Sequence, residues 1–181
     1  MIPLESLEYL MRCCSQALSD ITDEDRGRLA DLILSAKRIF IFGVGRSGLV
    51  GQTFAIRLVQ LGLQVYFVGD MTTPILRKDD FLLLISNTGK TISVVTTAQI
   101  ARRIGTHVAC VTSDRDSKLA QNSDTVLLVH SADRKVDSEM APLGTVFEDA
   151  KFLFFDTIVP DLMRRLGRSE TDMRNNHAIW V

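Results

Sequence analysis

The chain has 181 residues, of which 46% are apolar and 24% are charged, and its 21 basic and 22 acidic residues leave a formal net charge of -1. This length fits a single domain with a sizeable core, and the composition excludes disordered, collagen-like and disulfide-framework chains. The balanced charge gives no support to nucleic-acid binding or to a polybasic membrane surface, so we expect neither a nucleic acid nor a membrane as partner.

Hydropathy and cysteine usage indicate where the protein works. Apolar runs such as residues 81–85 are far shorter than the roughly 20 residues that a bilayer span requires, and the N-terminus lacks the pattern of a signal peptide. Three cysteines, with Cys13 and Cys14 adjacent, fit a reducing compartment and are poorly placed to share a metal. We therefore expect a cytoplasmic protein with buried thiols and no metal site.

Two helices are expected before the first strand, over residues 1–36. In the first helix, apolar residues recur at alternating steps of three and four, which predicts a buried face formed by Leu4, Leu7, Met11, Cys14 and Leu18. Thr22 and the acidic residues after it supply a cap and an acidic first turn for the second helix. That helix is expected to carry Leu29, Leu32 and Ile33 inward.

From Ile39 onward the pattern changes to short, continuous apolar or β-branched runs, which are typical of strands covered on both faces. Such runs lie at residues 39–42, 65–68, 81–85, 107–112 and 125–129. Two of the helix-length segments between them, 49–61 and 92–104, end at Gly62 and Gly105, where left-handed caps would fall. The alternation predicts a doubly wound α/β fold, with a flavodoxin-like five-stranded parallel sheet and helices on both faces.

The C-terminal part of the chain differs from the rest. Residues 144–166 are apolar nearly all round, so this segment should be deeply buried or packed against another subunit. Because a single domain offers little room for such a helix, we favour oligomerisation. The polar tail over residues 167–181 closes with apolar residues around Trp180, and this end is expected to dock on a surface.

Ligands of open α/β sheets bind beyond the carboxyl ends of the strands, so the loops there are the first candidates for a site. The loop after the first strand reads Gly43-Val44-Gly45-Arg46-Ser47-Gly48 and opens a helix. Its glycines let the backbone approach a phosphate, and the helix N-terminus offers free N–H groups. The loop also matches the dinucleotide fingerprint GxGxxG, with Asp70 near the place of a ribose-binding acid, and a tight turn that merely needs glycine is a further alternative.

The loop after the third strand reads Ser86-Asn87-Thr88-Gly89-Lys90-Thr91 and places three hydroxyls and one amide at the start of a helix. A cup of hydroxyl and backbone donors suits a phosphate, because a phosphate carries several acceptor oxygens. A Walker loop is excluded, since its first glycine would fall at Leu84. An ordinary serine or threonine cap is the alternative interpretation.

With these two loops, the chain resembles the sugar isomerase (SIS) domain family and, within it, the 6-phospho-3-hexuloisomerases. Further matches follow in order along the chain: Ser93 to Val95, Thr112-Ser113 with Asp116 to Ala120, Pro142 to Glu148, and the ending His177-Ala178. The resemblance therefore covers nearly the whole chain as a single SIS domain over residues 1–181.

The resemblance implies an isomerase of the ribulose monophosphate pathway that interconverts D-arabino-hex-3-ulose 6-phosphate and D-fructose 6-phosphate through an enediol, without a cofactor. It implies Glu148 as the base that moves the substrate proton. It also implies a homotetramer in which residues 167–181 pack on a neighbouring subunit and His177 acts in that subunit's site. The residues implied to bind the sugar phosphate are Gly45, Ser47, Ser86, Asn87, Thr88 and Thr91.

The sequence departs from the family at Lys90, where glutamate is usual, and at Asn87, where a small residue is common. The change at Lys90 either tightens phosphate binding or indicates another sugar phosphate as substrate. Two other classes of function stay open at this point: a non-catalytic phosphosugar-binding module and a small nucleotide-binding protein.

Overall fold

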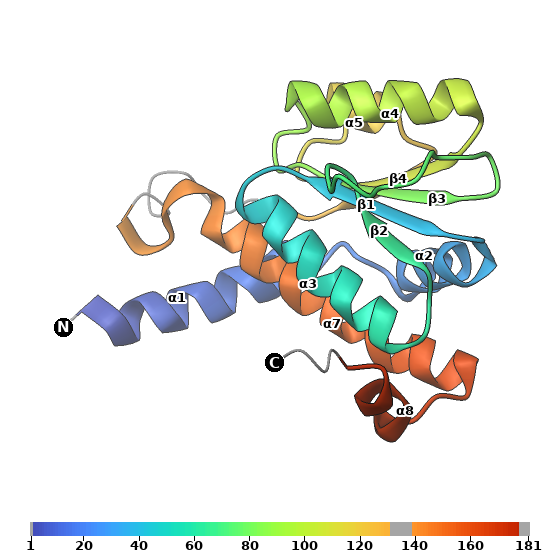
Figure 1. The fold of residues 1–181 in the computed structure, drawn as a ribbon. Helices are drawn as coiled ribbons and strands as arrows, with labels where there is room; N and C mark the ends of the chain where they lie inside the picture. The colour runs from blue at the N-terminus through green and yellow to red at the C-terminus, as the bar shows by residue number, and fades with distance from the viewer. Residues whose placement is uncertain (1, 131–138, 178–181) are drawn as a thin grey trace.

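A computed structural model describes residues 2–130 and 139–177, which form a five-stranded parallel sheet with helices on both faces (Figure 1). The strand order β2-β1-β3-β4-β5 is the flavodoxin-like order, so the predicted fold class is confirmed. The strands are β1 (Ile39–Gly43), β2 (Val65–Phe67), β3 (Phe81–Ile85), β4 (His107–Thr112) and β5 (Thr125–Leu128).

Helices cover the two faces of the sheet unequally. On one face lie α4 (Ile92–Ile104) and the short α5 (Lys118–Gln121), and Figure 1 shows both above the sheet. On the other side lie α1 (Ile2–Ala17), α2 (Asp23–Ser35), α3 (Arg46–Gln60) and α7 (Thr145–Leu166). A 3-10 turn (Pro142–Gly144) precedes α7, and α8 (Glu170–Asn175) follows it.

The strands alternate their side chains between two cores, one on each face. Ile39 and Ile41 of β1 join the core beneath α3 and α7, whereas Phe40 joins the core beneath α4. All five residues of β3 are buried, because β3 lies in the middle of the sheet between β1 and β4. Burial on both faces is the reason why these strands are continuous apolar runs in the sequence.

The expected helix ends are present in the structure. Thr22 caps α2 in a capping box with Asp25, and Gly105 ends α4 in the left-handed conformation at φ 86°. Gly62, one residue beyond the cap of α3, has φ 88°. Within the described residues, no helix combines the length and the apolar character that crossing a bilayer would require.

The buried face predicted for α1 is wrong over its first turns. Leu4, Leu7 and Met11 are 64%, 52% and 68% exposed, and α1 instead packs through Tyr9, Cys13, Cys14 and Ala17. These residues belong to the core beneath the sheet, whereas the N-terminal turns of α1 extend beyond the neighbouring helices (Figure 1). The apolar stripe is therefore a surface feature of the single chain.

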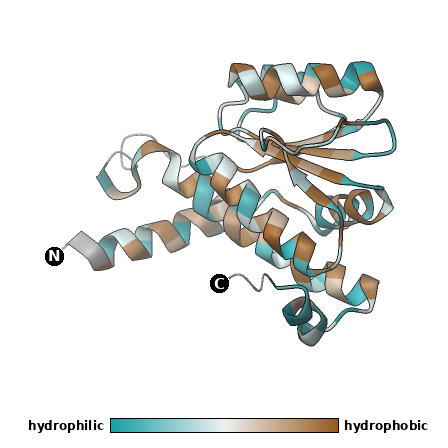
Figure 2. Cartoon of the chain, viewed as in Figure 1, coloured by the Kyte–Doolittle hydropathy of each residue, from teal (hydrophilic) through white to brown (hydrophobic). Residues whose placement is uncertain are grey.

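The expectation that α7 needs another subunit for its burial is also wrong for most of its length. Val146, Phe154 and Leu162 are among the α7 residues buried inside the chain, where α1, α2 and α3 pack around this helix. Phe155 stacks on Phe54 of α3 with ring centroids 4.4 Å apart. Figure 2 shows the apolar character of α7 continuing along the layer beneath the sheet.

Candidate functional site

The carboxyl ends of β1 and β3 lie side by side, with Gly43 paired to Ile85. The helices that follow these two strands leave on opposite faces of the sheet, α3 toward α7 and α4 toward α5. This is the topological switch point where ligands of open α/β sheets bind. A cavity of about 200 Å³ opens here, lined by Val44, Ser47, Ile85, Ser86, Asn87, Thr88 and Thr91.

We call this cavity, with its seven lining residues, the cup. Five of the six residues implied to bind the sugar phosphate line it. Ser47 comes from the first turn of α3, and the other four come from the segment between β3 and α4: Ser86, Asn87, Thr88 and Thr91. Gly45, the sixth, is the N-cap residue of α3 between two lining residues. Lys90 does not line the cup, and its side chain is exposed.

Close backbone packing explains the glycines of both loops. A Cβ at Gly48 would lie 2.5 Å from the carbonyl oxygen of Gly43, so α3 begins directly against the end of β1. Gly89 has φ 60°, and a Cβ there would lie 2.1 Å from Ser117 Oγ. Only glycine therefore lets the second loop pass over the start of α5.

Three helix N-termini around the cup are not capped by their own side chains. The N-cap residues of α3, α4 and α7 are Gly45, Thr91 and Gly144, and none makes a side-chain cap bond. By contrast, α2, α5 and α8 begin with the capping residues Thr22, Ser117 and Ser169. Helix N-termini without caps offer N–H donors and a positive dipole end, which favour an anion in the cup.

The hydroxyl of Thr91 bonds Ser86 Oγ at 3.1 Å inside the cup instead of capping α4. Each hydroxyl can donate one hydrogen and accept two, so the pair keeps capacity for a ligand oxygen. Both side chains therefore face the same ligand position. Thr91 therefore does not act as an ordinary side-chain cap of α4, which was the alternative interpretation of this loop.

Asn87 holds the second loop in place. Its backbone carbonyl accepts hydrogen bonds from Ser113 N, Ser113 Oγ and Thr112 Oγ1 at 2.9, 2.9 and 3.0 Å. Its side-chain oxygen Oδ1 is buried and has no hydrogen-bond partner within the part of the chain that the structure describes. A buried acceptor without a partner is costly, so a hydrogen-bond donor that reaches this atom would remove that cost.

Glu148 lies in the first turn of α7, where its carboxylate is largely buried, and it is not among the residues that line the cup. Arg46 Nε of α3 donates to Glu148 Oε2, and Arg46 also lies 3.7 Å from Asp149. The hydrogen bond to Glu148 raises the pKa of Arg46, which therefore stays charged. Arg46 stood in the first loop of the sequence, but its pairing with Glu148 required the packing of α3 on α7.

Lys151 is a second residue that the sequence analysis missed. Its side chain is fully buried one turn after Glu148, with Nζ 2.8 Å from Ser47 Oγ and 4.1 Å from the centre of the Phe147 ring. Burial is the largest cause that lowers its pKa, to about 7. In the sequence, the signal that could have identified Lys151 was its position as a charged residue inside the mostly apolar stretch 144–166.

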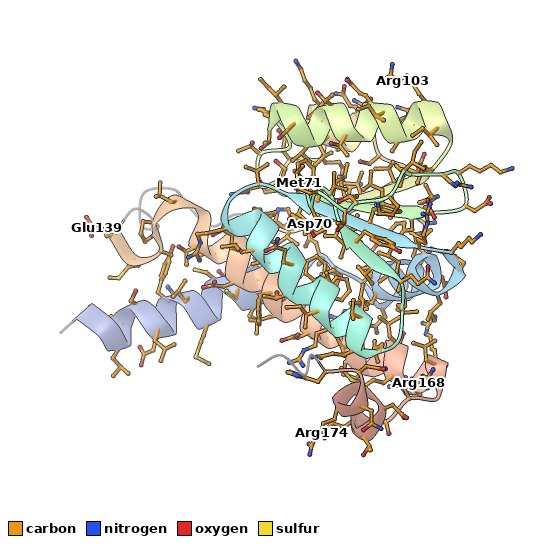
Figure 3. The ribbon with its side chains drawn as sticks, viewed as in Figure 1. Asp70, Met71, Arg103, Glu139, Arg168 and Arg174 are labelled. Carbon is orange, nitrogen blue, oxygen red and sulfur yellow. The ribbon has the colours of Figure 1, made fainter. Side chains whose placement is uncertain are left out.

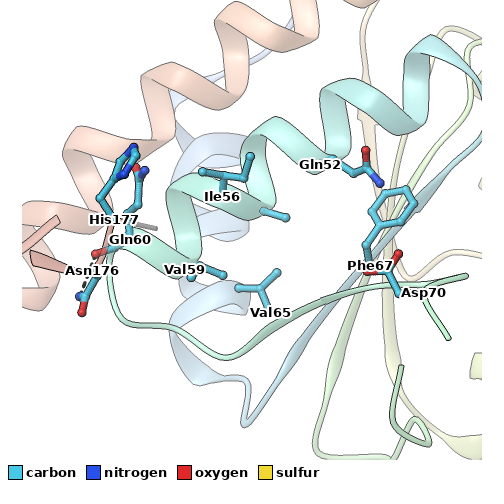
Figure 4. Close-up of a pocket in the computed structure, with 10 residues that line it drawn as sticks. Gln52, Ile56, Val59, Gln60, Val65, Phe67, Asp70, Asn176 and His177 are labelled. Carbon is cyan, nitrogen blue, oxygen red and sulfur yellow. Dashed lines mark hydrogen bonds between the residues drawn. The ribbon is translucent and has the colours of Figure 1, made fainter. Parts of the chain in front are cut away.

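His177 lies far from the cup of its own chain. It borders an apolar groove of about 620 Å³ along α3, and Figure 4 shows it beside Gln60 at the C-terminal end of that helix. Ser47 lies at the other end of α3, and 15 helical residues span about 20 Å. The structure thus separates His177 from Glu148 within one chain, and Ala178 to Val181 lie outside the described residues.

Asp70 does not line the cup either. It lies in the loop after β2 beside the fully exposed Met71, as Figure 3 shows, and it borders the apolar groove together with Gln52 and Phe67. The order of the strands is also not that of the Rossmann dinucleotide fold. The GxGxxG loop therefore lacks the strand order and the nearby acidic residue that accompany the dinucleotide fingerprint.

The matches to known proteins agree with this geometry. The SIS domain family model matches residues 32–146. A Methanocaldococcus jannaschii protein named 3-hexulose-6-phosphate isomerase is 40% identical over 83% of this chain and 81% of its own length. A Bacillus subtilis protein of the same name is 32% identical over 97% of this chain and 98% of its own length.

A solved structure extends the similarity to three dimensions. A crystal structure from Methanococcus jannaschii, for which a molecular function of 3-hexulose-6-phosphate isomerase was inferred, superposes with a TM-score of 0.88 at 34% identity. The match covers 98% of this chain and 99% of the other. The described fold, including the two N-terminal helices and α8, is thus shared over nearly the whole chain.

Proposed function

This chain belongs to the SIS domain family, alongside proteins named 3-hexulose-6-phosphate isomerase, and we propose that it interconverts D-arabino-hex-3-ulose 6-phosphate and D-fructose 6-phosphate. The observation that carries the proposal is the cup at the β1/β3 switch point, where hydroxyls and uncapped helix N-termini converge. A phosphate monoester dianion matches this set of donors.

The phosphate fixes the position of the sugar relative to Glu148. Ser47, Ser86, Thr88 and Thr91 supply hydroxyl groups for the phosphate, and α4 directs its N-terminus toward it. Glu148 pairs with Arg46, which immediately precedes the cup residue Ser47 in the chain. Binding energy from the distant phosphate then orients the carbon chain against the carboxylate, which lowers the entropy cost of the proton transfer.

The reaction moves a carbonyl between C3 and C2. The carboxylate of Glu148 takes the C2 proton of the 3-ketose, which gives an enediolate with its negative charge on O3. The proton of the 2-hydroxyl group moves to O3, and Glu148 returns its proton to C3, which leaves the carbonyl at C2. With O6 phosphorylated, the 3-ketose can close only four-membered rings through O1 or O5, so the substrate is open-chain. Arg46 adjoins Glu148 and is placed to stabilise negative charge that develops on the enediol oxygens.

Asn87 contributes to recognition of the sugar in this proposal. A phosphate monoester dianion has no hydrogen to donate, so it cannot satisfy the buried acceptor Asn87 Oδ1. A hydroxyl of the sugar can. Asn87 therefore favours a phosphate ester whose carbon chain carries hydroxyl groups over an ester without them.

The proposed assembly is a homotetramer in which His177 reaches the cup of a neighbouring subunit. Its support is the position of His177 at the far end of α3, about 20 Å from its own cup. Exposed apolar side chains on α1 and α3 offer surfaces for association, namely Leu4, Leu7, Met11, Leu49, Ile56 and Val59. The cytoplasmic location expected from the cysteine content stays a prediction.

An isomerisation assay over hexulose, aldose and aminosugar phosphates tests the proposal directly. Turnover should be highest with the 3-hexulose 6-phosphate and its product fructose 6-phosphate. Stabilisation against heat by fructose 6-phosphate without turnover of any sugar phosphate would indicate a binding module instead, and stabilisation by NAD alone would indicate a nucleotide-binding protein.

A further inference from the structure

We infer that Lys151 is a positioning residue for the sugar phosphate: from beneath the cup it holds the Ser47 hydroxyl in the orientation that donates to the phosphate, and it supplies a buried positive charge that the dianion requires. This inference rests on the proposed function, because it concerns how the same cup binds its ligand. It adds a residue that does not itself line the cup.

The geometry places Lys151 behind Ser47. The ammonium group is fully buried on α7, and it lies 2.8 Å from Ser47 Oγ on the first turn of α3. Ser47 in turn lines the cup. The lysine thus contacts the phosphate site through one hydroxyl, and the path runs from α7 through α3 to the ligand.

The charge state of the lysine decides the direction of this hydrogen bond. A protonated ammonium group has only donors, so it can only donate to Ser47 Oγ, and the hydroxyl hydrogen of Ser47 must then point elsewhere. The cup is where an acceptor arrives. A neutral amine has a lone pair and can accept from Ser47, which would turn the hydroxyl hydrogen away from the phosphate.

The surroundings of Lys151 contain groups that favour its protonated form and groups that favour its neutral form. Its burial disfavours the charge, Glu148 and Asp149 on α7 favour it, and Arg46 on α3 opposes it. On the side of α1, the Cys14 thiol has a pKa raised to about 11 by burial and is neutral near pH 7. A dianion in the cup adds negative charge close by, so ligand binding favours the protonated lysine.

Proton uptake on binding is therefore the measurable consequence. Above neutral pH, where the free protein holds a partly neutral lysine, binding of fructose 6-phosphate should take up roughly half to one proton per site. The dissociation constant should increase about tenfold between about pH 7 and about pH 8.5, so the affinity falls. The phosphate group itself stays a dianion over this range. Calorimetry in buffers of different ionisation enthalpy measures both quantities on the intact protein.

Two variants separate positioning from a structural role. Lys151→Met keeps the length of the side chain and removes its charge, so it should weaken fructose 6-phosphate binding about tenfold at pH 7 and abolish the proton uptake. The value of kcat should change less than KM. Ser47→Ala should weaken binding as well, and the double variant should lose less affinity than the two single losses combined, because part of the effect of the lysine passes through the serine.

The outcomes are distinct. Unchanged affinity and an unchanged pH profile in Lys151→Met, or binding without proton uptake by the unmodified protein, would overturn the inference. The measurement of proton uptake uses the unmodified protein, so it tests the inference even if Lys151→Met fails to fold. Lysine-dependent binding without any isomerisation would refute the proposed function and leave the inference standing. If neither fructose 6-phosphate nor inorganic phosphate binds, both are refuted.

Discussion

Arg46 on α3 and Glu148 on α7 form a direct ion pair although they lie 102 residues apart in the sequence. The pair joins the loop that forms one wall of the cup to the helix that carries the proposed base. Because the carboxylate is largely buried and the guanidinium is more than half exposed, the arginine can move toward a ligand while Glu148 stays in place.

Glu148→Gln should abolish most turnover. The amide keeps the shape of the side chain and an acceptor for Arg46, but it cannot take a proton from carbon, so kcat should fall about 10²–10⁴-fold. Fructose 6-phosphate should still raise the melting temperature of this variant, since the cup is intact. Full activity in Glu148→Gln would show that another group is the base.

Arg46→Gln should lower kcat/KM about 10–100-fold, because a hydrogen bond to a charged group is removed beside the reacting atoms. Its melting temperature should fall only modestly, because glutamine can still donate a hydrogen bond to the largely buried Glu148 carboxylate. The matched control is Arg103→Gln on the outer side of α4, which Figure 3 shows directed away from the sheet and which should leave the kinetics unaltered. Equal losses in both variants would contradict a specific role for Arg46.

Thr91→Val should raise KM for the phosphorylated sugar about 10–100-fold, because the substitution keeps the shape and removes a hydroxyl from the cup. Thr96→Val changes the same residue type on an exposed position of the same helix, and it should leave KM within about twofold. Steady-state kinetics of the two variants compare them directly. If Thr96→Val has the larger effect, the cup does not hold the phosphate.

The Glu148→Gln variant and the His177→Ala variant should each be nearly inactive. Activity should return when the two proteins are dissociated, mixed and reassembled into oligomers that contain both kinds of subunit. If each site takes Glu148 from one subunit and His177 from a neighbour, random mixing of equal amounts restores about a quarter of the sites. Mass measurement of the assembly in the same samples reports whether it is a tetramer. Mixing without recovery, in exchanged oligomers, would exclude a shared site.

The stability of the protein should rise with pH just above neutrality. The pKa of Lys151 is about 7 in the folded chain and 10.5 ordinarily, so between these values the unfolded chain binds a proton that the folded chain does not. The free energy of unfolding should therefore increase by about 2 kcal/mol between about pH 7 and about pH 8.5. Urea titrations at one fixed protein concentration measure this change.

The pH range ends at about 8.5 because ionisation of the cysteine thiols affects stability at higher pH. Burial raises the pKa of Cys14 and of Cys110 from 9.0 to about 11, so deprotonation of the unfolded chain lowers stability at higher pH. Lys151→Met is the matched variant. It should be at least as stable as the unmodified protein at pH 7 and should lose the rise, since no buried amine has to shed its proton on folding. A rise of the same size in this variant would assign it to other groups.

Local features of the fold could be predicted from the sequence because they depend on neighbouring residues. The strand runs at residues 81–85 and 107–112 coincide with β3 and β4, and Gly105 ends α4 where its position indicated. The two loops of the cup were also recognised, since glycines and hydroxyls at helix starts have a local meaning for phosphate binding. Their meeting at one cavity followed from the parallel sheet.

The sequence by itself thus determined the class of fold, the edge of the sheet where the cup lies and most side chains that line the cup. Only the tertiary structure decided that Arg46 pairs with Glu148, that Lys151 supports Ser47, that α7 is buried within its own chain and that the apolar stripe of α1 is exposed. The physical reason is that these contacts depend on how α1 and α3 pack against α7. Periodicity shows that a helix has an apolar face, but it does not show which neighbour covers that face.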